Sequence, residues 1–117
     1  DFKEKYDADD MKVTLKGKQV RGVSKILTEE QTHAESIGML YFRGDGPDLF
    51  RNSLENAMRE PSGLKSWFLS VIDAMAKRDM VVACSISGQR WAEIDFIDDL
   101  DSAEEILAPS KPAQPPV

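Results

Sequence analysis

The stretch GQRWAEIDFIDDLDSAEEIL, residues 88–107, decides the fold of this chain. It begins with the alternating segment WAEID, in which a period of two places Trp91, Glu93 and Asp95 on one face of a strand. Leucine, alanine and isoleucine then recur at helical spacing, and aspartates occupy the first turn, where the helix dipole favours anions. The stretch therefore predicts a strand that leads into a helix, with carboxylates at the junction.

Asp95 lies at the carboxyl end of the predicted strand, the position from which α/β sheets present ligand-binding side chains. Mg²⁺ prefers oxygen ligands and commonly binds through one or two protein carboxylates, while phosphates and waters complete its coordination shell. Asp95, helped by Glu93, is therefore a candidate ligand for Mg²⁺. The competing interpretation is an acidic strand end followed by an ordinary acidic helix start.

The rest of the chain alternates strand-like and helical segments, which predicts an α/β fold. Two alternating runs around Gly17 predict a hairpin with a three-residue loop. Two runs rich in β-forming or apolar side chains predict further strands, and apolar residues at helical spacing predict two helices. In chain order the predicted elements are a hairpin over residues 11–15 and 19–24, a strand over 36–42, helices over 47–60 and 63–77, and a strand over 80–86.

Several single residues are predicted to be structural. Cys84 lies in an apolar run and is expected to be a buried thiol. Because it is the only cysteine, it cannot form an internal disulfide, which favours a reducing compartment, the cytoplasm. His33 lies in a polar stretch and is expected to be solvated. Trp67 shares the apolar face of its predicted helix and is expected to belong to the core.

Composition and charge exclude some classes of function. The 117 residues carry a formal net charge of −6, and their 15 Lys and Arg form no run. Binding of nucleic acid relies on a basic patch, so nucleic acid is not an expected partner. No apolar run approaches the ~20 residues of a membrane span, so no membrane contact is expected. The proline-rich residues 108–117 are expected to form an extended linker or tail.

Four groups of residues occur in the order and spacing of a known family. They are Met-Lys-Val at 11–13, Val-Ser-Lys at 23–25, Glu-Ser-Ile-Gly-Met at 35–39, and W-x-E-I-D-x-x-x-D-L-x-x-A-E from Trp91 to Glu104. Together they resemble the MobA-like nucleotidyltransferases, nearest the phosphocholine and 2-aminoethylphosphonate cytidylyltransferase branch. The resemblance covers roughly residues 8–107, which is most of the chain.

The resemblance implies a Rossmann-like α/β domain, with a mixed sheet and flanking helices. In this family a glycine-rich loop near the amino terminus holds the nucleotide, and a first metal-binding aspartate follows it. Neither feature occurs in this sequence. We therefore expect residues 1–107 to be the C-terminal, acceptor- and metal-binding half of a nucleotidyltransferase domain. The N-terminal nucleotide-binding half would be missing, and a fused domain could follow or precede the chain.

The resemblance also implies roles for individual residues. Lys25 would hold the phosphate or phosphonate of the acceptor, a task that suits the compact charge of an ammonium group. Asp95 would hold Mg²⁺ together with an aspartate from the missing half. Glu93 would either support Asp95 or contact the acceptor, and both roles remain open. Lys25 and Asp95 are therefore the expected catalytic residues.

Glu35 is a further candidate for substrate binding. If the acceptor carries an ammonium group, Glu35 is a candidate for its counter-charge, with Tyr41 or Trp67 offering an aromatic face. The competing interpretation is an exposed glutamate at the start of a strand.

The expected function is Mg²⁺-dependent transfer of a cytidylyl group from CTP to a phosphorylated or phosphonate amino alcohol, with release of pyrophosphate. The piece alone is expected to be inactive. One rival interpretation keeps the fold and makes the protein a sugar-1-phosphate nucleotidyltransferase. A rival of another class is a non-catalytic α/β interaction module, in which the acidic junction only caps a helix.

Overall fold

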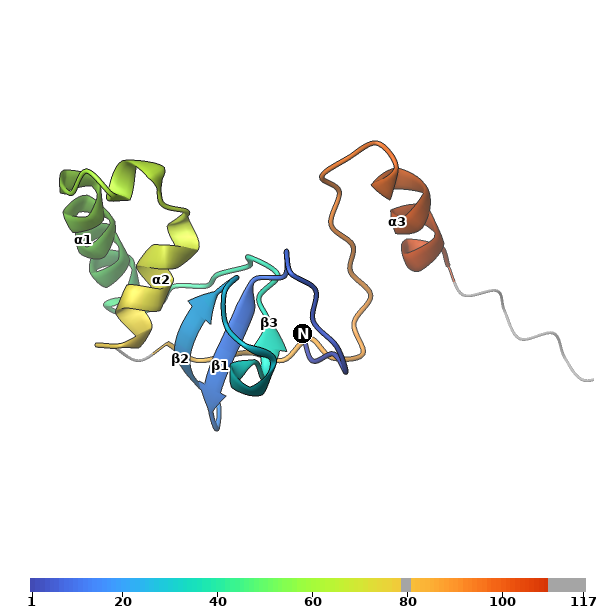
Figure 1. Ribbon diagram of the computed structural model, residues 1–117, viewed down its shortest axis with the longest axis horizontal. Coiled ribbons are helices and arrows are strands. Elements are labelled where there is room, and N and C mark those ends of the chain that lie inside the picture. The colour runs from blue at the N-terminus through green and yellow to red at the C-terminus, as the bar shows by residue number, and fades with distance from the viewer. Residues whose placement is uncertain (79–80, 110–117) are drawn as a thin grey trace, which may run out of the picture. The chain divides into compact units, whose positions relative to one another are not determined.

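The computed structural model describes residues 1–78 and 81–109. Within these residues it is a mixed α/β chain with a three-stranded antiparallel sheet and three α-helices (Figure 1). The α/β class is thereby confirmed, whereas the Rossmann-like arrangement stays a prediction. The chain divides into two compact units, Asp1–Ser85 and Ile86–Val117, and each is described by itself. Most of the expected tail, residues 110–117, lies outside the described residues.

The sheet of the first unit has the strand order β2-β1-β3, with β1 at Lys12–Lys16, β2 at Gln19–Ser24 and β3 at Ala34–Glu35. The predicted hairpin is confirmed, although its loop has two residues instead of three, because Lys16 pairs with Gln19. Gly17 adopts a φ of 61° in this loop, a conformation that glycine allows and that a Cβ disfavours.

Alternation along the strands gives the sheet one apolar face, and α2 (Phe68–Ala76) packs on it. Valines 13, 20 and 23 are buried on this face together with side chains from α2 such as Ile72 and Met75. A polar contact also joins the two elements, because the backbone N–H of Val23 donates to Asp73 Oδ1 at 2.8 Å. The middle of α2 is thus held close to the end of β2.

The first predicted helix is confirmed as α1 (Gly46–Arg59), with proline in its first turn. The second predicted helix is divided. A 3-10 turn, η2 (Gly63–Lys65), precedes α2, and the backbone at Ser66 and Trp67 between them is extended. Trp67 is therefore 62% exposed, and its predicted place in the core is wrong.

Three predicted strands differ from the structure. Residues 36–42 and 91–95 form no strand, and residues 81–86 contain only an isolated bridge between Gln19 and Val82, while residue 80 lies outside the described residues. A strand requires a neighbour that accepts and donates its backbone hydrogen bonds. In the described part of the chain β1 offers its second edge to only two residues of β3.

Two predictions about single residues have opposite outcomes. Cys84 is exposed, so its predicted burial is wrong, because the apolar run that carries it does not become a covered strand. His33 is exposed as predicted, and its Nδ1 accepts the backbone N–H of Leu15 at 3.0 Å. The His33 ring therefore provides a hydrogen-bond acceptor for a backbone N–H group of β1.

In the second unit the predicted helix is confirmed as α3 (Asp99–Leu107). Asp99 Oδ2 accepts the backbone N–H groups of Asp95 and Phe96, which fixes the turn that leads into the helix. Ala103 is the buried residue of α3, and most large apolar side chains of this unit are exposed: Ile94, Phe96, Ile97, Leu100, Ile106 and Leu107. None of the helices in the described residues combines the length and apolar character that crossing a bilayer requires.

Candidate functional site

Lys25, the residue expected to hold the acceptor, lines an open pocket of about 210 Å³ between the end of β2 and the start of α2. Both apolar and polar residues line the pocket, and they come from three separate segments. Its lining residues are Met11, Val23, Ser24, Lys25, Ser66, Trp67 and Ser70. A residue that the sequence predicts to bind substrate therefore lines a cavity.

The Lys25 backbone and side chain are both held in place. Lys12, which is 7% exposed on β1, donates from Nζ to the carbonyl oxygen of Lys25 at 2.8 Å. The Lys25 ammonium lies 4.2 Å from the centre of the Trp67 ring, which is a cation–π contact. The charge of Lys25 thus stays at the rim of the pocket, where a ligand can reach it.

The positive end of α2 also borders the pocket. The N-cap side chain of α2 makes no capping hydrogen bond, and the backbone N–H of Ser70 donates to the carbonyl oxygen of Trp67 at 2.9 Å. Two serine hydroxyls beside the helix start donate to backbone carbonyls, Ser66 to Ser62 at 2.9 Å and Ser70 to Trp67 at 2.6 Å. The Lys25 ammonium and the positive end of the α2 dipole favour an anion here, whereas both hydroxyl protons are already donated to the backbone.

Glu35 does not line this pocket and is not the exposed glutamate that the sequence also allowed. It is 7% exposed in β3, and its Oε2 lies 2.5 Å from Lys3 Nζ. The same ammonium lies 3.1 Å from Asp10 Oδ2, which also accepts the backbone N–H of Asp7 at 2.9 Å. Lys3, Asp10 and Glu35 therefore form one cluster, which we call the ammonium cluster.

Two pKa values in the ammonium cluster, those of Lys3 and Asp10, shift in favour of the charged forms. Burial works to lower the pKa of Lys3, but its contacts with Glu35 and Asp10 outweigh burial and raise it. Burial works to raise the pKa of Asp10, but hydrogen bonds from the Asp7 N–H and from Lys3 lower it. Lys3 and Asp10 thus stabilise each other in their charged forms.

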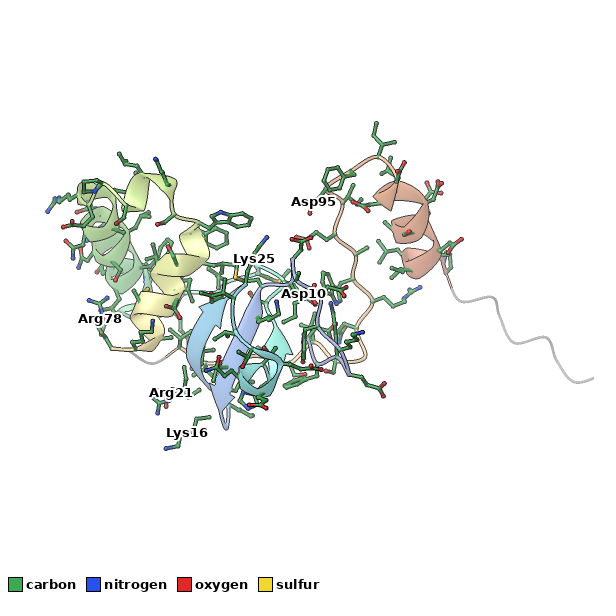
Figure 2. The ribbon with its side chains drawn as sticks, in the orientation of Figure 1. Asp10, Lys16, Arg21, Lys25, Arg78 and Asp95 are labelled. Atoms are coloured by element: carbon green, nitrogen blue, oxygen red, sulfur yellow. The ribbon has the colours of Figure 1, made fainter. Side chains whose placement is uncertain are left out.

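Asp95 and Glu93 lie in the second unit, and both side chains are exposed; Figure 2 labels Asp95 there, and it labels Lys25 and Asp10 in the first unit. The backbone of Asp95 is fixed by Asp99, while its carboxylate is accessible to solvent. That Lys25 and Glu35 act at one site with Glu93 and Asp95 stays a prediction.

A test of the donor set shows what these residues can offer a metal ion. No group of three or more His, Cys, Asp or Glu side chains within residues 1–78 and 81–109 is placed to hold one. Asp95 offers one exposed carboxylate, which fits the kind of Mg²⁺ site that relies on one or two carboxylates plus phosphates and water. Further ligands would have to come from the substrates or from other protein groups.

Sequence reasoning did not find every residue of these sites. Lys12, Lys3 and Asp10 were not singled out, and Trp67 was expected mainly in the core. Lys12 gave no signal of burial, because alternation places it with Lys16 on the polar face of its strand, opposite Met11 and Val13. Lys3 and Asp10 lie in a charged segment without periodicity, which gave no such signal.

Comparison of the sequence with protein-family models, with curated proteins and with solved structures finds no match.

Proposed function

We propose that this chain is the acceptor-binding part of a nucleotidyltransferase. The reaction is transfer of a cytidylyl group from CTP to a phosphorylated or phosphonate amino alcohol, with Mg²⁺ and with release of pyrophosphate. The complete domain would be Rossmann-like, with a mixed sheet. The observation that carries the proposal is that Lys25, the lysine of the Val-Ser-Lys motif, lines a pocket at the start of α2.

The pocket supports this assignment by its charge and by its size. The Lys25 ammonium and the positive end of the α2 dipole favour a phosphate or phosphonate, and Met11 and Val23 suit a short alkyl chain. A volume of about 210 Å³ lies below the ~300 Å³ at which sites for drug-sized ligands begin. A small phosphorylated molecule therefore fits the pocket better than a whole nucleotide does.

The mechanism asks for positioning and charge compensation more than for covalent catalysis. An acceptor oxygen forms a bond to the α-phosphorus of CTP, and the bond between that phosphorus and the pyrophosphate oxygen breaks. Lys25 would orient the acceptor and offset its negative charge during the attack. Asp95 would hold Mg²⁺ together with a carboxylate from another part of the domain, and the bound ion would supply Lewis-acid stabilisation of charge. Glu93 would support Asp95 or contact the acceptor.

The exposed apolar side chains of the second unit also support a larger domain. Phe96 is 75% exposed and Ile97 is 84% exposed, and both directly follow Asp95. Contiguous apolar surface of this kind commonly marks a place where more protein binds. In the proposed enzyme, this surface would be covered by the rest of the nucleotidyltransferase domain.

The test is pyrophosphate release by a protein that joins this chain to the nucleotide-binding half that the proposal requires. CTP with 2-aminoethylphosphonate or phosphocholine should release pyrophosphate in a Mg²⁺-dependent way. Removing the Lys25 or Asp95 charge should lower kcat/KM by about 100-fold or more, since each removes a charge contact in the transition state. Lys25→Met and Asp95→Asn are the variants, and Lys18→Met and Asp101→Asn are controls on exposed charges of the same type.

The same assay separates the rival interpretations. Turnover only with a sugar 1-phosphate would keep the reaction and change the acceptor. Full activity of Asp95→Asn, with unchanged Mg²⁺ dependence, would refute the role of Asp95. No turnover with any nucleotide and acceptor would favour the non-catalytic interaction module.

A further inference from the structure

We propose that Lys12 is a positioning residue for Lys25: its buried ammonium group fixes the turn that carries Lys25 and thereby directs the Lys25 side chain to the pocket. The inference rests on the proposed function and deepens it, because it names a residue that sets acceptor affinity without touching the acceptor. Lys12 is not among the residues that line the pocket.

The backbone of Lys25 lacks the support that a strand gives. The pairing of β1 with β2 ends where Lys12 meets Ser24, so Lys25 is the first residue beyond the ladder and lies in a turn. A residue beyond the last ladder pair has backbone groups that the neighbouring strand no longer fixes. A fixed direction for its side chain therefore requires another partner.

The Lys12 side chain supplies that partner. Its Nζ donates to the carbonyl oxygen of Lys25 at 2.8 Å, and it lies 3.4 Å from the carbonyl oxygen of Ala8 and 3.5 Å from that of Asp10. An ammonium group has three N–H donors, and a hydrogen bond from a charged donor is stronger than one between neutral groups. The shortest bond goes to Lys25, and the two longer ones tie the same ammonium to the N-terminal segment.

The burial of Lys12 separates the role of its charge from that of its carbon chain. Lys12 is 7% exposed, and it forms no ion pair within residues 1–78 and 81–109. Glu35, its partner in the β1–β3 ladder, pairs with Lys3 instead. Burying an ammonium without a counter-ion costs more than burying an apolar side chain of the same length. Lys12 therefore contributes a directed hydrogen bond to Lys25 that packing alone would not provide.

The turn connects this hydrogen bond to the pocket. The Ser24 hydroxyl accepts the backbone N–H of Ile26 at 3.2 Å, so the residues on both sides of Lys25 are also held. The Lys25 ammonium then lies 4.2 Å from the centre of the Trp67 ring. A side chain on a fixed backbone loses less conformational freedom when it binds an anion. Removing the Lys12 ammonium should therefore weaken acceptor binding by releasing the turn.

The experiment measures the affinity for 2-aminoethylphosphonate by calorimetry on the full chain and on two variants. Lys12→Met keeps the length of the side chain and removes its donors. It should weaken binding by about tenfold, the lower end of the range found for groups that orient a metal ligand. Lys16→Met is the matched control, because it removes the same charge from an exposed lysine of the same strand. It should change the affinity by less than about twofold, as expected for a remote surface charge.

A second readout follows Lys25 without any ligand. In the wild type, ¹⁵N relaxation should show the amides of Lys25 and Ile26 to be as rigid as those of β2, and the Lys25 side chain should give nuclear Overhauser contacts to the Trp67 ring. Lys12→Met should lose both the rigidity and the contacts, while the β1–β2 ladder stays rigid. Lys16→Met should keep them.

Two results would overturn the inference while leaving the Lys25 pocket intact. One is a Lys12→Met variant whose loss of affinity is no larger than that of Lys16→Met. The other is a Lys12→Met variant that binds more weakly while Lys25 keeps its rigidity and its contacts with Trp67, since the loss would then not act through Lys25. Absence of binding by the wild type would instead contradict the proposed function, and the inference with it.

A measurement on the wild type covers the case in which Lys12→Met does not fold. The protons of the Lys12 ammonium should exchange with water more slowly than those of the exposed Lys16, because they are buried and hydrogen-bonded. If the bond to Lys25 favours acceptor binding, a bound acceptor must stabilise that bond by the same factor. Bound 2-aminoethylphosphonate should therefore slow the exchange of Lys12 further. Exchange as fast as that of Lys16, or exchange that the ligand does not slow, would overturn the inference.

Discussion

Asp10 is the residue through which the ammonium cluster makes stability depend on pH. Partial burial opposes ionisation, but the hydrogen bonds from Asp7 and Lys3 lower its pKa in the folded state. A carboxyl whose pKa is lower when folded than the ~3.9 of an unfolded aspartate stabilises the fold above that value. This contribution is lost as the pH falls through the folded pKa, because protonation removes the preference for the folded state.

We therefore expect Asp10→Asn to be less stable than the wild type at pH 7 by about 1.5 kcal/mol, the lower end of the range for a hydrogen bond to a charged group. The difference should shrink as the pH falls below the ~3.9 of an unfolded aspartate and vanish below the lower folded pKa, where the wild-type carboxyl is protonated in both states. Urea unfolding at neutral and acidic pH measures both quantities. Asp9→Asn, on an exposed neighbour, should change stability little at either pH. A difference between Asp10→Asn and wild type that does not vary with pH would contradict this role.

At the residue scale, the sequence predicted which side chain lines a pocket better than it predicted which side chains are buried. The motif around Lys25 placed a lysine at the end of β2, and that residue does line a pocket. The burial of Lys12 and Glu35 was not foreseen, because it depends on contacts with an N-terminal segment that shows no periodicity. Cys84 shows the opposite error. Its apolar neighbours predicted a buried strand, but the described residues form no such strand there and Cys84 is exposed.

At the scale of elements, the turn between α1 and α2 depends on Gly63. A Cβ at this position would lie 1.8 Å from the carbonyl oxygen of Ala57, a distance that no side chain can tolerate. The only relief is movement of the backbone that joins the two helices, because the contacted atom is itself backbone.

Gly63→Ala should therefore destabilise the chain by about 2 kcal/mol or more, as overpacking against a rigid group does. Gly46→Ala is the matched control, because its Cβ would meet Phe42 at 3.5 Å, an ordinary contact, at the start of α1. It should change stability by less than about 1 kcal/mol, with a small gain from helix propensity. Guanidinium unfolding of both variants measures the difference, and equal losses would show that the turn is not constrained as described.

The sequence correctly predicted the elements that depend only on local sequence patterns. The hairpin follows from alternation around Gly17, α1 from its apolar spacing with Pro47, and α3 from its acidic first turn. The strands expected at residues 36–42 and 91–95 depend on neighbours, which a local pattern does not specify. The extended backbone at Trp67 had no local signal, and it divides one predicted helix into a 3-10 turn and α2.

At the scale of the whole molecule, each unit holds one part of the proposed chemistry. The first unit carries the Lys25 pocket, and the second carries Glu93 and Asp95 next to exposed apolar side chains. This distribution supports an enzyme in which an acceptor-binding part and a metal-binding carboxylate act with further protein. It also means that acceptor binding can be tested on this chain without any turnover.

The most direct test of the account is an NMR titration of the ¹⁵N-labelled chain with 2-aminoethylphosphonate. Binding in the Lys25 pocket should give saturable shifts at Ser24, Lys25 and Ser70 and at the indole N–H of Trp67. Lys25→Met should abolish these shifts, whereas Lys65→Met, which changes an exposed lysine outside the lining, should preserve them. No saturable shift in the pocket, or the same shifts in Lys25→Met, would contradict the claim that Lys25 holds the acceptor.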